Sequence, residues 1–220
     1  MLSIRLIPLF TGLLPILVVH TTYLVSASEG YVAWCFPYIE SCTSISATGR
    51  QGTAFFIFKA TMIPAAALQM IYWVLTDRWL KTLGDGLLPA RVIMFLGITA
   101  AIFLVIYTVA LGASGDEFRL QRRIGIIIYF TFTFLAQLLL AWRVGLLRRQ
   151  DASLPLLRMI CYLLLGTGLL TLLLDSSIDN YAEYENAFEW LFALVIHIFF
   201  LVTWKTWRNT GFSVITRARP

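Results

Sequence analysis

The sequence predicts an all-α, polytopic integral membrane protein with six transmembrane helices and both termini in the cytoplasm. Composition is the first observation: the 220 residues are 59% hydrophobic and only 13% charged, whereas about a quarter of the residues in a soluble domain carry charge. The others are six apolar runs of membrane-spanning length and the placement of Lys and Arg in the connections between them.

The six apolar runs fill most of the chain, so we expect one membrane domain over residues 1–220. A helix needs about 20 residues to cross the hydrocarbon core. The first run follows Arg5, a weak charged start without a close small-residue cleavage site, so we interpret it as a retained span rather than a signal peptide. In chain order the runs cover about 6–26, 54–75, 90–113, 124–146, 156–175 and 187–207.

The orientation follows from the basic residues, because Lys and Arg in short connections stay on the cytoplasmic side. The side that holds Arg5 also holds Arg78, Lys81, Arg91, Arg143, Arg148, Arg149, Arg158, Lys205, Arg208, Arg217 and Arg219. The opposite side holds Arg50, Arg119, Arg122 and Arg123. The net charge of +5 therefore reflects topology, and without a basic stripe carrying stacking aromatics we expect no nucleic-acid partner.

Aromatic residues near the span ends are typical of interfacial belts. We expect Trp73, Trp79, Trp142, Trp204 and Trp207 at the inner interface and Tyr23, Tyr31, Trp34, Tyr38, Tyr181 and Tyr184 at the outer one. The short loops fit a plasma membrane or a bacterial inner membrane, and an endomembrane would give the same charge pattern.

The first outer connection, residues 27–53, is the most polar passage of the chain and is called the outer loop below. Cys35 and Cys42 lie in it, where an oxidising compartment permits a disulfide, whereas Cys161 lies in the fifth span. Two unrelated thiols are the alternative. The loop has no CxxC and no His, so we expect neither a metal site nor a cofactor.

Ionisable residues occur at similar depth in four spans. Lys59, Asp175, Glu189 and His20 all fall toward the outer end of their spans. Because charge in a bilayer is costly and marks functional candidates, we expect a polar pocket that opens outward, with a Lys59–Glu189 ion pair. The alternative is that each group separately reaches an interface or a hydrogen-bond partner.

The outer loop offers groups that recognise a lipid headgroup. Ser44, Ser46, Thr48 and Arg50 can hydrogen-bond phosphate or sugar oxygens, and Gly49 permits a close backbone approach. A Ser/Thr/Gly turn that merely joins two helices is the alternative.

Weak candidates for catalysis are His197 or His20 as base and Ser46 as nucleophile, with Glu189 as orienting acid. His197 lies about 12 Å below Glu189 at 1.5 Å per residue, which is far from a loop serine. Gln69 and Gln137 share its depth, and a histidine bonded to a neighbouring helix is the simpler reading.

Several segments occur in a familiar order: Thr43–Gly49, Pro64 followed by Tyr72-Trp73, Ala113–Phe118, Glu189-Trp190 and Trp204. They resemble the DRAM/FRAG/SFK family of six-span membrane proteins, closest to the branch that remodels GPI-anchor lipids. The resemblance implies an all-helical protein that acts on or senses lipids. That branch is expected to carry His where this chain has Thr61, Gln137 and Phe200, so its acyl-transfer chemistry does not transfer directly.

These observations predict a membrane protein that binds or organises lipids through an outward-facing polar pocket and regulates lipid composition or lipid-modifying membrane partners. A lipid-remodelling acyltransferase is the alternative, and a small-molecule transporter is third. The sequence contains no nucleotide-binding loop and no serine-hydrolase elbow. Membrane lipids are the expected partners.

Overall fold

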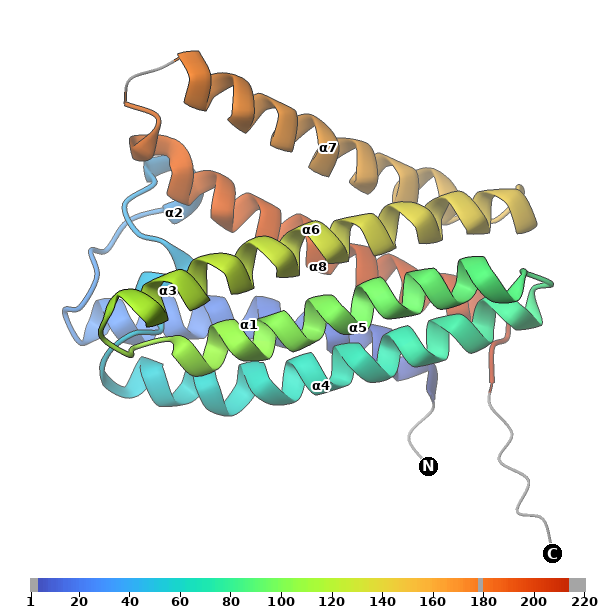
Figure 1. Ribbon diagram of the computed structural model, residues 1–220, viewed down its shortest axis with the longest axis horizontal. Helices are drawn as coiled ribbons and strands as arrows, with labels where there is room; N and C mark the ends of the chain where they lie inside the picture. Colours follow the sequence, from blue (N-terminus) through green and yellow to red (C-terminus); the bar gives the residue numbers. More distant parts are fainter. Residues whose placement is uncertain (1–3, 178–179, 214–220) are drawn as a thin grey trace, which may run out of the picture.

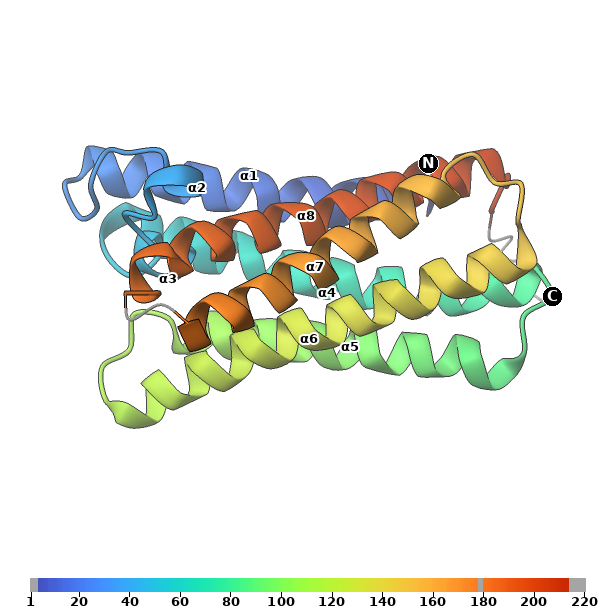
Figure 2. The ribbon, with the colours of Figure 1, turned by 90° about the horizontal axis from the view of Figure 1, so that it is seen from above.

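Six long helices form a closed ring in which each helix contacts its neighbours in the chain and the last contacts the first (Figures 1 and 2). The computed structural model describes residues 4–177 and 180–213, except for the side chains of residues 182 and 183. Arg217 and Arg219, predicted on the inner side, lie outside the described residues. The helices are α1 (Ile7–Ser28), α4 (Gly52–Thr82), α5 (Leu87–Ala110), α6 (Asp116–Leu147), α7 (Leu154–Ser177) and α8 (Ala182–Asn209).

All six helices are long and apolar enough to cross a membrane, which confirms the predicted all-α fold class. The outer loop adds two short helices between α1 and α4: α2 (Pro37–Glu40) and α3 (Ile45–Thr48). Pro37 opens α2 at a position where its missing N–H costs nothing. Ser44 caps α3 by accepting a hydrogen bond from the Ala47 N–H at 3.1 Å.

Two helices extend furthest beyond their apolar runs. α4 continues to Thr82, seven residues past the predicted end, because its last turns bury Trp79 and Leu80 completely. α6 begins at Asp116, eight residues before the predicted start, and carboxylates in the first turn favour the positive end of the helix dipole. Hydropathy detects only the part of a helix that lies in hydrocarbon, so it misses both extensions.

The two described chain ends lie together at one end of the bundle, opposite the outer loop. The Arg5 guanidinium donates a hydrogen bond of 2.9 Å to the Phe212 carbonyl, which ties the start of the chain to the segment after α8. We call this the inner end and the end with the outer loop the outer end. The assignment of the inner end to the cytoplasm rests on the basic residues and stays a prediction.

The inner end is packed with aromatic side chains. Trp73, Trp79 and Trp207 are fully buried there, and the rings of Tyr72 and Trp207 stack at 5.5 Å. The prediction that these three tryptophans lie in an interfacial belt is therefore wrong, because packing between α4 and α8 encloses them. Trp142 is 55% exposed and faces outward as expected of a belt residue.

Charged groups also connect elements at the inner end. Asp85, in the turn between α4 and α5, pairs with Arg143 near the end of α6, and Arg143 Nε donates to Asp85 Oδ2 at 3.2 Å. The Asp85 side chain is completely buried. This pair fixes the α4–α5 turn against α6.

Glycine lets the backbones of neighbouring helices approach closely at two places. A Cβ on Gly12 of α1 would lie 2.8 Å from the His197 carbonyl oxygen of α8. A Cβ on Gly125 of α6 would lie 3.2 Å from the Phe103 carbonyl oxygen of α5. Small residues of this kind let helix backbones approach in membrane bundles.

One helix is packed along only part of its length. The buried residues of α7 are Leu154, Leu157, Ile160, Cys161 and Leu164, all in its inner half. The outer half of α7 diverges from α6 and α8 (Figure 1). The ring is consequently less tightly packed around the outer half of α7.

Candidate functional site

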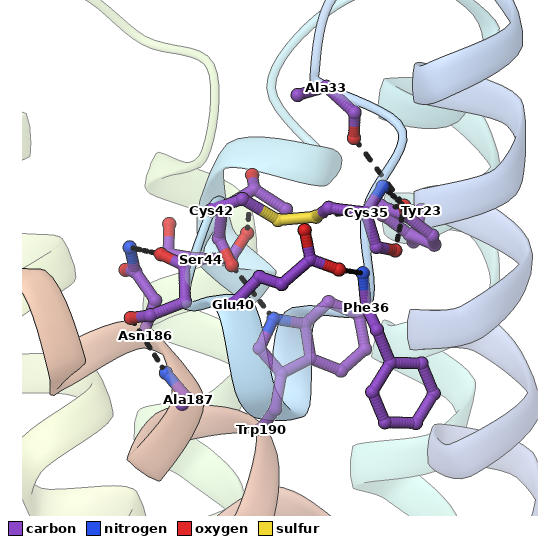
Figure 3. The surroundings of a disulfide bond; sticks show 12 residues. Tyr23, Ala33, Cys35, Phe36, Glu40, Cys42, Ser44, Asn186, Ala187 and Trp190 are labelled. Atoms are coloured by element: carbon purple, nitrogen blue, oxygen red, sulfur yellow. Dashed lines mark hydrogen bonds between the residues drawn. A yellow bond between two sulfur atoms is a disulfide. The ribbon is translucent and has the colours of Figure 1, made fainter.

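The outer loop is closed by a disulfide between Cys35 and Cys42, which confirms that prediction (Figure 3). The Tyr23 hydroxyl of α1 donates to the Cys35 carbonyl at 2.6 Å and accepts from the Cys35 N–H at 2.8 Å. At the other end of the loop, Glu29 accepts the Thr53 N–H at 3.0 Å in the first turn of α4. The loop is thus anchored to both helices that it joins.

The loop is also attached to α8, far along the chain. The Asn186 side-chain amide donates to the Ser41 carbonyl at 2.8 Å, and the Trp190 indole donates to the Thr43 carbonyl at 2.9 Å (Figure 3). Backbone amides of Ile45 and Ser46 interact with the partly buried carboxylate of Glu189. Ser44 caps the same end of α3, so Glu189 lies beside the N–H groups at the start of this helix.

These attachments place α3 at the outer end of a groove between α6, α7 and α8. The groove has a volume of about 960 Å³. Its walls are mostly apolar, and they include Ile127, Phe134, Leu165, Leu169 and Phe192. The polar groups gather at its outer end: Ser44, Ser46, Arg50, Tyr107, Arg119, Arg122, Arg123, Glu185, Asn186 and Glu189.

Backbone and hydroxyl contacts orient two of the groove arginines. Arg122 Nη1 donates to the carbonyls of Ala110 and Ala113 at 3.0 and 2.8 Å, where α5 ends. Arg50 Nη2 donates to Ser46 Oγ at 2.8 Å, and Ser46 Oγ lies 3.0 Å from Ser44 Oγ. A guanidinium has five N–H donors, so both arginines keep donors for a ligand.

Four of the eight predicted pocket residues line this groove: Ser44, Ser46, Arg50 and Glu189. Thr48 does not, since it is fully buried and its hydroxyl donates to the Ile45 carbonyl at 2.7 Å. Gly49 also faces inward, where a Cβ would lie 2.9 Å from the Phe58 ring. The small size of Gly49 therefore serves packing against α4.

Lys59 and Asp175 also lie away from the groove lining. Lys59 Nζ donates to the Val109 carbonyl of α5 at 3.0 Å and lies 4.3 Å from the centre of the Phe55 ring. The expected Lys59–Glu189 ion pair is therefore absent from the described structure. Asp175 is exposed on α7.

The two histidines meet at a separate, small internal cavity of about 40 Å³, which Glu189 also lines. Nδ1 of His20 lies 2.7 Å from the Ile16 carbonyl, and Nδ1 of His197 lies 2.5 Å from the Ala193 carbonyl, so both carry their proton on Nδ1. Each Nε2 then accepts from a tyrosine hydroxyl at 3.0 Å, Tyr38 for His20 and Tyr129 for His197.

Neither histidine is presented to the groove as a free base. Partial burial raises the pKa of Tyr38, which keeps that hydroxyl protonated as the donor to His20. Ser46 lines the groove, whereas His20 and His197 do not. A nucleophile and a base are therefore not brought together among the predicted catalytic residues.

No protein-family model, curated protein or solved structure matches this chain. Among the described residues, no cluster of His, Cys, Asp and Glu has the arrangement of a metal site.

Sequence reasoning missed the arginines of α6. Arg119, Arg122 and Arg123 were interpreted only as topology markers, yet all three line the groove. Their position was a usable signal, because three arginines on the outer side oppose the positive-inside trend. Tyr107 was also missed, and nothing in its apolar surroundings marks it in the sequence.

Proposed function

We propose that this protein binds a membrane phospholipid in the groove between α6, α7 and α8 and thereby organises lipids or presents them to lipid-modifying membrane partners. One observation carries the proposal. A continuous groove joins a cationic, hydroxyl-rich outer end to apolar walls that open sideways between membrane-spanning helices. A phospholipid has the same division between a phosphate-bearing headgroup and hydrocarbon chains.

The dimensions of the groove fit one leaflet. The 12 positions from Arg122 to Phe134 of α6 correspond to about 18 Å at 1.5 Å per residue. Half of a hydrocarbon core is about 15 Å. With the arginines at the interface, the apolar walls would reach the bilayer centre and accommodate an acyl chain. The volume also falls in the range of about 300–1,000 Å³ that is usual for ligand pockets.

Arginine is suited to the proposed headgroup contact. Guanidinium groups bind phosphate through two parallel hydrogen bonds, and the structure fixes Arg122 and Arg50 at the groove entrance. Ser44 and Ser46 add hydroxyls beside them. The resemblance to the DRAM/FRAG/SFK family agrees with a lipid ligand, and membership of that family is part of the proposal, as is residence in a plasma membrane or bacterial inner membrane.

A binding function accounts for the site better than acyl transfer. The small cavity beside His20 and His197 has room for about one water molecule, and both Nε2 atoms are occupied by tyrosine hydroxyls. The proposed ligand would occupy the groove, whereas both histidines line the small cavity. Binding requires only the groove.

The proposal is tested by filling the groove. The full-length protein is purified in mild detergent and its co-purifying phospholipid is quantified by mass spectrometry. Leu169→Trp places an indole in the groove, and Leu17→Trp makes the same change on the exposed face of α1, outside it. We expect Leu169→Trp to lower the lipid-to-protein ratio at least about threefold, equivalent to somewhat under 1 kcal/mol. Equal ratios in the wild type and both variants would exclude a specific site.

A further inference from the structure

The two walls of the groove carry opposite charge at the outer end. All of the charged residues that the outer loop and α6 contribute to the lining are cations, namely Arg50, Arg119, Arg122 and Arg123. α8 contributes the carboxylates of Glu185 and Glu189. The groove entrance therefore has a cationic wall and an anionic wall that face the same space.

The anionic wall has no cation of its own. The sequence contains no Lys or Arg between Arg158 and Lys205. In the described part of the chain, neither Glu185 nor Glu189 belongs to an ion pair. Burial raises the pKa of Tyr181, and the carboxylates of Glu185 and Asp175 raise it further. The unpaired carboxylate of Glu185 favours a cationic ligand.

Aromatic rings lie on the same wall. Tyr181, Phe188 and Phe192 line the groove beside Glu185, and the Tyr181 and Phe188 rings stack at 6.3 Å. Aromatic faces attract quaternary and primary ammonium groups through cation–π interactions. A carboxylate with neighbouring rings is thus the usual chemistry of an ammonium site.

A buried hydroxyl lies at the base of the entrance. Tyr107 is 3% exposed, and its buried hydroxyl has no hydrogen-bond partner within the described residues. A buried hydroxyl without a partner is unfavourable. Because Tyr107 lines the groove, a ligand oxygen there would satisfy it.

We infer that the groove selects a zwitterionic phospholipid, with its phosphate against Arg122 and Arg123 and its terminal ammonium or choline group against Glu185 and the rings of Tyr181 and Phe188. This inference rests on the proposed lipid-binding function. An anionic headgroup would satisfy the arginines but would bring no cation to the unpaired carboxylate of Glu185. Selectivity thus comes from the ammonium contact on α8 in addition to the phosphate contact on α6.

The experiment compares four dihexanoyl phospholipids with identical chains, titrated into the full-length protein in detergent and followed by native mass spectrometry. The headgroups are phosphocholine, phosphoethanolamine, phosphoglycerol and free phosphate. We expect the two zwitterionic lipids to bind about tenfold more tightly than the two anionic ones. Glu185→Gln should reduce that preference to near one. Arg122→Gln combined with Arg123→Gln should weaken binding of all four.

Glu117→Gln is the matched control, because Glu117 is exposed in the first turn of α6 and does not line the groove. Glu185 is exposed as well, so Glu185→Gln should fold, which thermal melting verifies. Equal or tighter binding of the anionic lipids to the wild type would overturn the selectivity while leaving lipid binding intact. If Leu169→Trp leaves the binding of all four lipids unchanged, the groove is not the binding site.

Discussion

The indole N–H of Trp190 in α8 donates a hydrogen bond to the backbone carbonyl of Thr43 in the outer loop, at 2.9 Å and across 147 residues of chain. This contact positions the segment that carries Ser44 and Ser46. The hydroxyl-bearing rim of the groove is therefore held by the same helix that supplies its carboxylates.

Replacing Trp190 with Phe should remove this hydrogen bond and leave the buried Thr43 carbonyl without its donor. We expect a loss of about 1–3 kcal/mol of stability, measured as a lower melting temperature in detergent. Trp34→Phe is the control, since Trp34 is 64% exposed and melting should not change. Identical melting of the two variants would show that the contact does not hold the loop.

The disulfide should restrain the outer loop. Replacing both Cys35 and Cys42 with Ser removes a cross-link that typically contributes about 2–4 kcal/mol. We expect faster amide hydrogen exchange in residues 36–44 and a lower melting temperature. Reduction of the wild type should produce the same exchange pattern, because Cys161 lies elsewhere in the core. Unaltered exchange in the loop would mean that the contacts to α8 suffice.

Tyr129→Phe should destabilise the bundle without affecting lipid retention. It removes the donor to His197 Nε2 in a fully enclosed site, which costs about 1–3 kcal/mol. Tyr38→Phe removes the equivalent donor to His20 at a half-buried site, where water can replace it, so the effect should be smaller. Loss of bound lipid in Tyr129→Phe at unchanged melting temperature would instead indicate that the histidine cavity contacts the ligand.

Arg143→Gln should be strongly destabilising, because it leaves the buried carboxylate of Asp85 unpaired. Breaking such a pair costs about 3 kcal/mol or more, which thermal melting will detect. The double variant Asp85→Asn/Arg143→Gln should recover much of that loss. Arg119→Gln removes a solvent-exposed pair with Asp116 and should change stability by less than about 1 kcal/mol. Comparable losses in the two single variants would contradict the role of Asp85.

The sequence was sufficient for the fold class and for part of the site. Apolar run length predicts the six helices, and the oxidisable cysteines of the outer loop predict the disulfide. Ser44, Ser46, Arg50 and Glu189 were recognised because polar groups at one depth stand out in an apolar chain.

The remaining errors have one physical origin. A span that is apolar on all sides reveals the depth of a residue but not the face on which it lies. Lys59 and Glu189 share a depth, yet Lys59 contacts α5 and Glu189 contacts α3. The basic turns of α6 lie outside its apolar run, so the sequence did not reveal that they continue a groove wall.

Under the proposed lipid-binding function, the uneven packing of α7 would affect the breadth of ligands that the protein can accommodate. All of the buried side chains of this helix lie between Leu154 and Leu164, so a displacement of its outer half would break no buried contact. Hydrocarbon chains of different thickness, including unsaturated or branched ones, could be accommodated by that displacement while the other five helices keep their positions. Discrimination between lipids would then depend on the headgroup, and the protein would bind lipids with different acyl chains almost equally well.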